Sequence, residues 1–233
     1  MAFVKGKTSK KIRTAHRYLG LFLGIQFLFW TISGLYFSWT DLDEIHGDHF
    51  KKIKIKKDFK DLISPSNLEY VNGIKSIELR DFNNNPYYWI NNELLVNANT
   101  GIKKDSISKD EAISISNENI LEKYKISFVE KIYEVGNHHE YRGKPLPAYV
   151  ISYEGSDNLK SYVSTLDGQF QTVRHRNWRW FDFLWMTHTM DYETRDDFNH
   201  KLIRLFSIMG LITVLSGFIL WAITSKTLKK IFK

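Results

Sequence analysis

The sequence predicts a membrane protein in which a two-helix transmembrane hairpin carries an exported α+β domain. The first observation is that residues 18–40 and 205–225 contain no charged side chain, although 25% of the chain is charged. Helices of 23 and 21 residues are about 30–35 Å long, which is enough to cross the hydrocarbon core of a bilayer.

The second observation is the distribution of charge. Residues 1–17 hold six Lys or Arg, residues 226–233 hold four, and neither tail holds an acid. The residues between the two runs hold 23 bases and all 26 acids, so the tails account for the net charge of +7. Because basic residues flank spans on the cytoplasmic side, we predict a protein of the bacterial inner membrane with both termini cytoplasmic and residues 41–204 on the periplasmic side. Basic tails beside spans indicate contact with the lipid bilayer and argue against nucleic acid as a partner.

The first element is a cytoplasmic basic tail, residues 1–17, followed by transmembrane helix 1, residues 18–40. A cleaved signal peptide is the alternative reading. The apolar run is longer than that of a signal peptide, and no small-residue cleavage site precedes Asp41. Tyr18 at one end and Trp39 at the other are typical of a retained span with aromatic belts.

Residues 41–177 form the predicted exported α+β region. Ser108 and Glu111 make a capping box for a helix that we expect to continue to Tyr124. Val96–Gly101 and Val163–Gly168 share a pattern of Val, four residues and Gly, which suggests two similar units at about 61–107 and 108–175. Two unrelated hairpins are the alternative. The predicted strands cover 74–80, 87–90, 93–98, 125–135, 148–153, 160–165 and 169–174.

The remaining elements return the chain to the membrane. Three tryptophans, Trp178, Trp180 and Trp185, lie among arginines, which favours an interfacial amphipathic segment over residues 178–200 that includes a helix. Transmembrane helix 2, residues 201–225, and a second basic tail, residues 226–233, complete the predicted order.

Several kinds of chemistry are excluded by residue content. The chain has no cysteine, so it has no disulfide, thiolate metal site, iron–sulfur cluster or covalently attached c-type haem. Motifs for zinc proteases, serine hydrolases and nucleotide-binding loops are missing, and we predict no metal site from protein ligands alone. The spans hold no ionisable carrier for protons, and Gln26 is expected to bond to a neighbouring helix.

Motifs in both spans carry a family resemblance. The first span opens with His16-Arg17-Tyr18-Leu19-Gly20-Leu21 and ends with Ser33-Gly34, while the second follows His188 and ends with Ser216-Gly217 and Trp221. These stretches resemble the PepSY-associated transmembrane (PepSY-TM) family, and the exported part resembles PepSY modules, which are small α+β units. The resemblance in the spans covers about 80 of the 233 residues, including both stretches long enough to cross a bilayer.

Some members of that family are four-helix reductases that use haem b to reduce siderophore-bound iron. This resemblance implies haem b as the cofactor. The chain has two spans where those reductases have four, so a complete electron path would require two copies, as a homodimer, or a larger membrane complex. Gly20-x-x-x-Gly24 and Thr213-x-x-x-Gly217 offer small-residue faces, either for such pairing or for the hairpin within one chain.

A transmembrane haem b needs two axial ligands, which are usually imidazoles. The candidates by position are His16, His188, His200 and His46, with His49 as a weaker fifth. The predicted topology separates His16 from the others by a bilayer. One copy can therefore complete at most one bis-histidine site, at the exported face, and a cytoplasmic site needs His16 of a second chain. Alternatively, these histidines are interfacial residues, and Arg174, Arg176 and Arg179 are either propionate partners or phosphate anchors.

Two functional hypotheses therefore stand side by side, and whether the chain is an enzyme stays open. The first is an inner-membrane haem protein that transfers electrons outward as a ferric-reductase-like component of iron uptake. The second is a non-catalytic, membrane-anchored PepSY module that binds or scaffolds a partner, or a small accessory subunit of a larger membrane complex. An absorption spectrum separates them, since only the first binds haem.

Overall fold

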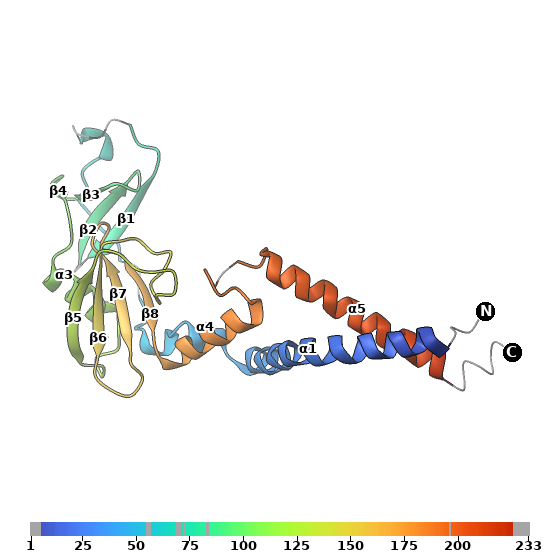
Figure 1. Cartoon of the computed structure of the whole chain (residues 1–233). Helices are drawn as coiled ribbons and strands as arrows, with labels where there is room; N and C mark the ends of the chain where they lie inside the picture. The colour runs from blue at the N-terminus through green and yellow to red at the C-terminus, as the bar shows by residue number, and fades with distance from the viewer. Residues whose placement is uncertain are drawn as a thin grey trace. The chain divides into compact units, whose positions relative to one another are not determined.

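The computed structural model describes residues 6–54, 57–68, 71, 73–82, 84–195 and 197–225. The chain divides into two compact units, Met1–Thr40 with Asp182–Lys233, and Asp41–Phe181. Figure 1 labels the helices and strands of both. The predicted cytoplasmic tail 226–233, and residues 1–5 of the other tail, lie outside the described residues.

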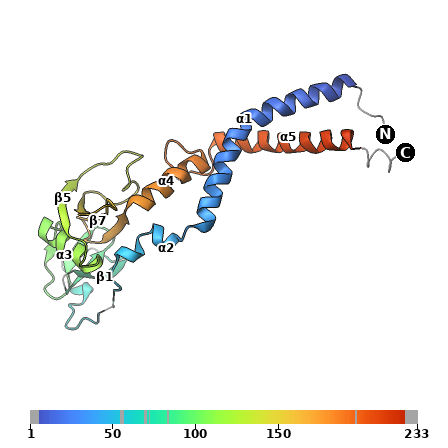
Figure 2. The same cartoon turned by 90° about the horizontal axis from the view of Figure 1, so that it is seen from below.

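Two long helices dominate the first unit, α1 (Gly6–Trp39) and α5 (Lys201–Thr224). Both are long and apolar enough to cross a bilayer, with mean hydropathies of 1.6 and 2.2 in their most apolar stretches. They run side by side in Figures 1 and 2. Helix α5 matches the predicted span. Helix α1 begins twelve residues before Tyr18, because most of the predicted basic tail is also helical.

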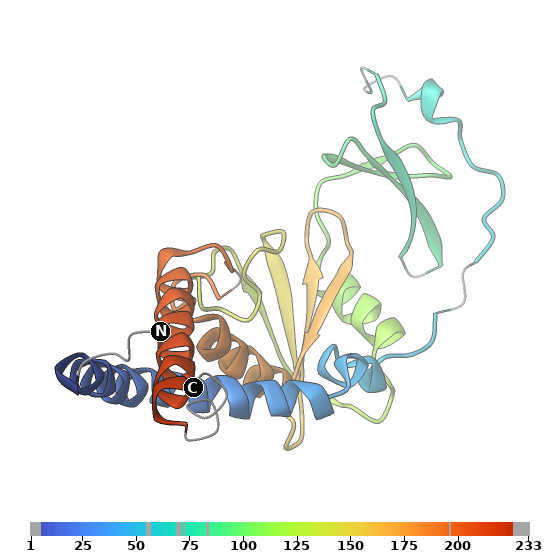
Figure 3. The ribbon, with the colours of Figure 1, turned by 90° about the vertical axis from the view of Figure 1, so that its right-hand side faces the viewer.

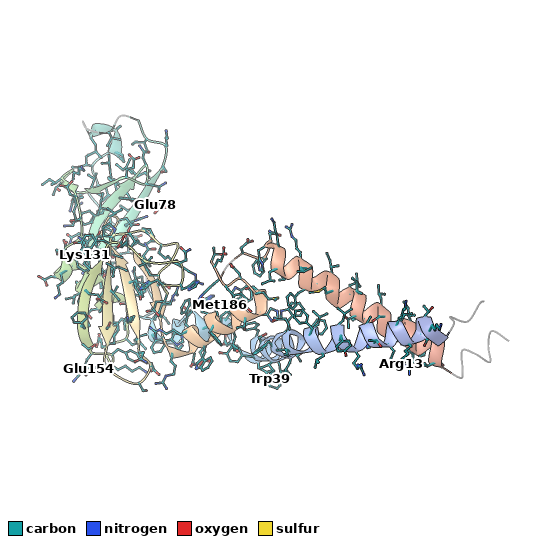
Figure 4. The ribbon with its side chains drawn as sticks, viewed as in Figure 1. Arg13, Trp39, Glu78, Lys131, Glu154 and Met186 are labelled. Atoms are coloured by element: carbon teal, nitrogen blue, oxygen red, sulfur yellow. The ribbon has the colours of Figure 1, made fainter. Side chains whose placement is uncertain are left out.

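Small and flat side chains fill the contact between α1 and α5. A Cβ atom on Gly210 would lie 3.0 Å from Cζ of Phe27, so glycine lets this ring pack tightly against α5. The rings of Phe22 and Phe206 stack with centroids 5.7 Å apart, and Thr213 is buried. Other apolar side chains point outward along both helices, as Figure 4 shows for α1 between Arg13 and Trp39.

Helix α4 (Arg176–Thr189) occupies the predicted aromatic segment and ends before its second half. The described residues between 190 and 200 form no helix, because the buried carboxylate of Asp191 accepts hydrogen bonds from the main-chain N–H groups of Glu193, Thr194 and Asp197. An aspartate used in this way holds a turn in place of a helix.

The second unit is α+β, as predicted, and contains two antiparallel four-stranded sheets in chain order. Short helices α2 (Leu42–Ile45), η1 (Asp48–Phe50) and η2 (Pro65–Asn67) precede the sheets, and η1 and η2 are 3-10 helices. The first sheet consists of β1 (Ile77–Phe82), β2 (Asn85–Ile90), β3 (Leu94–Asn97) and β4 (Lys103–Lys104). Helix α3 (Lys109–Asn119) leads to the second sheet, β5 (Ile126–Ile132), β6 (Ala148–Tyr153), β7 (Lys160–Ser164) and β8 (Phe170–Arg174).

Each sheet falls within one of the two units expected from the repeat. Gly101 and Gly168, which close the repeated pattern, both have left-handed φ values, 72° and 64°. The capping box is present, since Ser108 and Glu111 bond each other's main-chain N–H. The helix ends at Asn119 rather than Tyr124, because Ile120 is extended and forms a bridge with Lys51.

The two sheets share one core. Phe82 and Leu95 of the first sheet belong to the same buried cluster as Ile151 and Val163 of the second. Helix α3 covers strands β6, β7 and β8, as Figure 3 shows. The second unit is therefore one packed body, in which side chains from both sheets meet in one apolar cluster.

Candidate functional site

Two histidines of the first unit are held by serines of the opposite segment. Nδ1 of His16, on α1, lies 2.7 Å from Oγ of Ser216, on α5. Nδ1 of His188, near the end of α4, lies 2.7 Å from Oγ of Ser33, on α1. We call the first contact, with the adjoining Gly217, the His16 site, and the second, with Gly34, the His188 site.

The glycine beside each serine lets the imidazole approach the helix backbone. A Cβ atom on Gly217 would lie 3.2 Å from Cε1 of His16, which is tighter than ordinary contact. The equivalent distance from Gly34 to Cε1 of His188 is 4.0 Å, which leaves room for a methyl group. In each Ser-Gly pair, the serine therefore bonds to an imidazole and the glycine leaves room for it. The sequence showed both pairs as motifs but gave no sign of this role.

The sites lie far apart along α1. His16 and Ser33 are 17 residues apart, a rise of about 25 Å in an α-helix. Each site therefore stands near a different end of the helix pair, consistent with the separation expected from topology.

The end of α4, which carries His188, is fixed by polar side chains. Nε2 of Gln26 donates to the main-chain oxygen of Thr187 at 3.2 Å, and Nε1 of Trp30 donates to that of His188 at 2.7 Å. Nε2 of His200 bonds to the oxygen of Thr189 at 2.8 Å. Three consecutive carbonyls that a helix end leaves open are thus satisfied. The expected role of Gln26 as a bond to another helix is confirmed.

Aromatic rings surround the imidazole of His188. The ring of Phe37 meets it edge-on with centroids 5.5 Å apart, and Phe37 also contacts Trp185 at 5.7 Å. These rings restrict water on one side of the imidazole. The contact with Ser33 fixes the orientation of the ring.

The other candidate histidines differ in what their nitrogens contact. His200 caps α5: its Nδ1 accepts from the N–H of Ile203, while its Nε2 bonds to Thr189, so both nitrogens are used. His46 is an exposed C-cap residue of α2, in the second unit. His49 is also exposed and packs on Phe50. None of these three repeats the arrangement at His16 and His188.

His175 lies among polar and basic residues in the sequence, yet its side chain is buried in the second unit. Its side chain is 2% exposed, and its Nε2 bonds to the main-chain oxygen of Ile45 at 3.0 Å. Burial lowers the pKa of His175, because desolvation disfavours the charged imidazole. The sequence could not show this contact, since its partner lies 130 residues away.

The arginines that were candidates for haem propionates have protein partners. Arg179 pairs with Glu140, with Nε at 2.6 Å from Oε2, and Arg174 stacks over Trp178 at 3.9 Å. Burial opposes ionisation of Glu140, but hydrogen bonds from Arg179 and Tyr162 outweigh it and lower the pKa of this carboxyl. Glu140 lies in the loop between β5 and β6, and its ion pair with Arg179 is partly buried.

Within the described part of the chain, no group of three or more His, Cys, Asp or Glu residues is placed to hold a metal ion. The His16 and His188 sites each offer one imidazole. No protein-family model, curated protein or solved structure matches this chain.

Proposed function

We propose that this chain is a membrane-anchored electron-transfer protein, similar to the PepSY-TM family, that holds haem b at the His16 and His188 sites. One observation carries the proposal. Both imidazoles are fixed through Nδ1 by a serine, and neither Nε2 has a hydrogen-bond partner among the described residues. Metal-ligating histidines typically bind through one nitrogen while the other is held by an outer partner.

The membrane location is supported by the surface of the helix pair. Leu21 of α1 is 71% exposed and Phe218 of α5 is 64% exposed, and apolar neighbours along both helices are similar. Burying such a side chain is worth about 1.5–3 kcal/mol, so this much apolar surface is unfavourable in water. Basic segments at the start of α1 and after α5 favour cytoplasmic termini, with residues 41–204 in the periplasm.

The residues present fit haem when two copies pair. Each site supplies one imidazole, and the remaining histidine of this unit, His200, uses both nitrogens in protein contacts. Beside His16, a Cβ atom on Gly20 or Gly24 would have no neighbour within 4 Å, so this face of α1 is open to a flat group. A homodimer about an axis along the membrane normal brings each histidine opposite its own copy.

The sequence left Gly20 and Gly24 open either to pairing between copies or to the hairpin within one chain, and a Cβ atom on either glycine would meet nothing within 4 Å. The second small-residue pattern does serve that contact, since Thr213 is buried and Gly217 adjoins His16. The two patterns therefore have different roles, and the first is left for the haem side of α1.

When bound, haem iron would alternate between ferric and ferrous states and so carry single electrons. His16 and His188 would hold the iron through Nε2, while Ser33 and Ser216 orient the imidazole rings and Phe37 restricts water at His188. The family resemblance supplies the acceptor class, ferric complexes on the exported side.

The deciding experiment is the absorption spectrum of detergent-purified full-length protein, expressed with ample haem. We expect a Soret band, two haems per dimer, loss of about half the haem in either His16→Ala or His188→Ala, and loss of all in the double variant. His138→Ala is the matched control, since His138 is exposed in the second unit. A haem-free wild type, or full haem in the double variant, would sink the proposal.

A second candidate is the scaffold function. It is favoured by the second unit, whose core is closed by its own side chains and which is built around two sheets. It predicts that His16→Ala and His188→Ala leave function intact while surface changes in residues 41–181 abolish it, as expected for an interface with hot spots.

A further inference from the structure

The serine at each histidine site has one proton, and the structure shows where that proton goes. Oγ of Ser33 lies 2.6 Å from the main-chain oxygen of Phe29. A carbonyl oxygen only accepts, so the hydroxyl of Ser33 must donate to it. Oγ of Ser33 therefore has no proton left for Nδ1 of His188, 2.7 Å away, and this bond forms only if the imidazole donates.

Ser216 is under the same constraint at the other end of the helix pair. Oγ of Ser216 donates to the main-chain oxygen of Thr213 at 2.7 Å. Its contact with Nδ1 of His16, also at 2.7 Å, therefore requires a proton on Nδ1. Two sites that share no residue arrive at one hydrogen-bond pattern: imidazole to serine to helix carbonyl.

Two other histidines show the opposite pattern. Nε2 of His200 faces the carbonyl oxygen of Thr189 at 2.8 Å, and Nε2 of His175 faces that of Ile45 at 3.0 Å. Each must carry its proton on Nε2 to make these bonds. The chain therefore contains both neutral tautomers. The proton lies on Nδ1 where that atom faces a serine hydroxyl, and on Nε2 where that atom faces a main-chain carbonyl.

We propose that Ser33 and Ser216 are positioning residues that hold His188 and His16 as Nδ1–H tautomers. A neutral imidazole carries one N–H, so this tautomer leaves a lone pair on Nε2, the atom without a protein partner. The ligand that such a nitrogen takes is a metal centre with an open coordination position, and its identification as haem iron rests on the proposed function. His200 and His175 lack such a lone pair on Nε2 and are excluded as ligands through that atom.

The test is nitrogen-15 NMR of the histidine side chains in the full-length protein. The protein is reconstituted in nanodiscs without haem, at a pH above the pKa of free imidazole. Signals are assigned with His16→Gln and His188→Gln. We expect His16 and His188 to show a protonated Nδ1 and an unprotonated Nε2, and His200 to show the reverse. Signals of the Nε2–H form at His16 and His188 would overturn the proposal.

The variants test whether the Ser33 hydroxyl, rather than the residues around it, sets the tautomer of His188. Ser33→Ala should move His188 toward the Nε2–H form, while Ser33→Thr, which keeps the hydroxyl bonded to the helix carbonyl, should retain the wild-type signal. Ser38→Ala is the matched control, since Ser38 makes the same kind of helix bond, to Leu35, and is exposed. An unchanged His188 signal in Ser33→Ala contradicts the role of the serine. If that variant does not fold, the wild-type and threonine spectra decide.

Haem-loaded protein provides an independent readout. An outer-shell hydrogen bond strengthens a ligating imidazole, and losing one typically costs about 10–100-fold in metal affinity. We expect Ser33→Ala to weaken haem retention in that range and to raise the midpoint potential. An Nδ1–H signature in a protein that never binds haem would refute the proposed function and leave the tautomer assignment standing.

Discussion

Nε1 of Trp30 donates a hydrogen bond to the main-chain oxygen of His188 at 2.7 Å, which ties the end of α4 to the middle of α1. Together with the Ser33 contact, it fixes both the backbone and the ring of the same residue. The position of His188 is therefore set by α1 rather than by its own helix.

Trp30→Phe should remove this bond and leave the carbonyl of His188 without its donor. Unsatisfied buried groups cost about 1–3 kcal/mol, so we expect a loss of that size in the free energy of unfolding. Thermal unfolding in detergent, followed by circular dichroism, measures it. Trp39→Phe is the control, since Trp39 is 80% exposed. Equal effects of the two variants would contradict the capping role.

The two glycines at the histidine sites should respond differently to one methyl group. Gly217→Ala places a Cβ atom 3.2 Å from His16 and should displace the ring, whereas Gly34→Ala meets His188 at 4.0 Å and should be tolerated. The measurement is haem content per chain together with the nitrogen-15 signals. We expect Gly217→Ala to lose haem at the His16 site and Gly34→Ala to retain haem at the His188 site. The reverse result would contradict the close contact between Gly217 and His16.

The ion pair of Arg80 with Asp167 joins the two sheets at 2.8 Å, and both side chains are largely buried. Removing one partner of such a pair typically costs about 3–5 kcal/mol, because the other charge is left uncompensated. Asp167→Asn should therefore lower the free energy of unfolding of the second unit by about that amount. Glu78→Gln removes the exposed partner of the same arginine and should cost about 0–1 kcal/mol. Denaturation followed by tryptophan fluorescence compares the two.

Stability should fall in mild acid because of His175. Burial holds the pKa of this imidazole below its usual value of 6.5. As the pH falls below 6.5, the unfolded chain binds a proton that the folded chain does not, so the free energy of unfolding decreases until the folded pKa is reached. Denaturation midpoints from pH 8 to pH 5 measure this slope. His175→Gln should flatten it, and an unchanged slope in that variant would exclude His175 as the cause.

Membrane orientation can be tested with single cysteines, because the chain has none of its own. Ser156→Cys, in the second unit, should react with a membrane-impermeant maleimide added to spheroplasts. Ser9→Cys, near the start of α1, should react only after the membrane is permeabilised. The opposite pattern would reverse the orientation inferred from the basic tails.

Local signals were sufficient for much of the fold. The capping box of Ser108 and Glu111 set the start of α3, and the uncharged runs located α1 and α5. The end of α3 was missed because a bridge between Ile120 and Lys51, distant in sequence, decides it. Sequence patterns describe neighbours along the chain, and such contacts depend on tertiary packing.

The candidate site was predicted only in part for the same reason. His16 and His188 were identified by position and resemblance, but their serine partners lie 200 and 155 residues away. Ser33 and Ser216 appeared only as parts of motifs. Their function depends on one proton being donated to a helix carbonyl, which a sequence does not record.

Helix α1 contributes the histidine to one contact, His16 with Ser216, and the serine to the other, Ser33 with His188. Because α1 and α5 run antiparallel, sliding one helix along the other by a turn would separate His16 from Ser216, and the link from α4 to α5 would pull His188 away from Ser33. The pair of contacts therefore acts as a two-point clamp on helix register. A slip of one helix along the other would therefore disturb both imidazoles, whereas a change at one histidine site that keeps the register leaves the other contact in place.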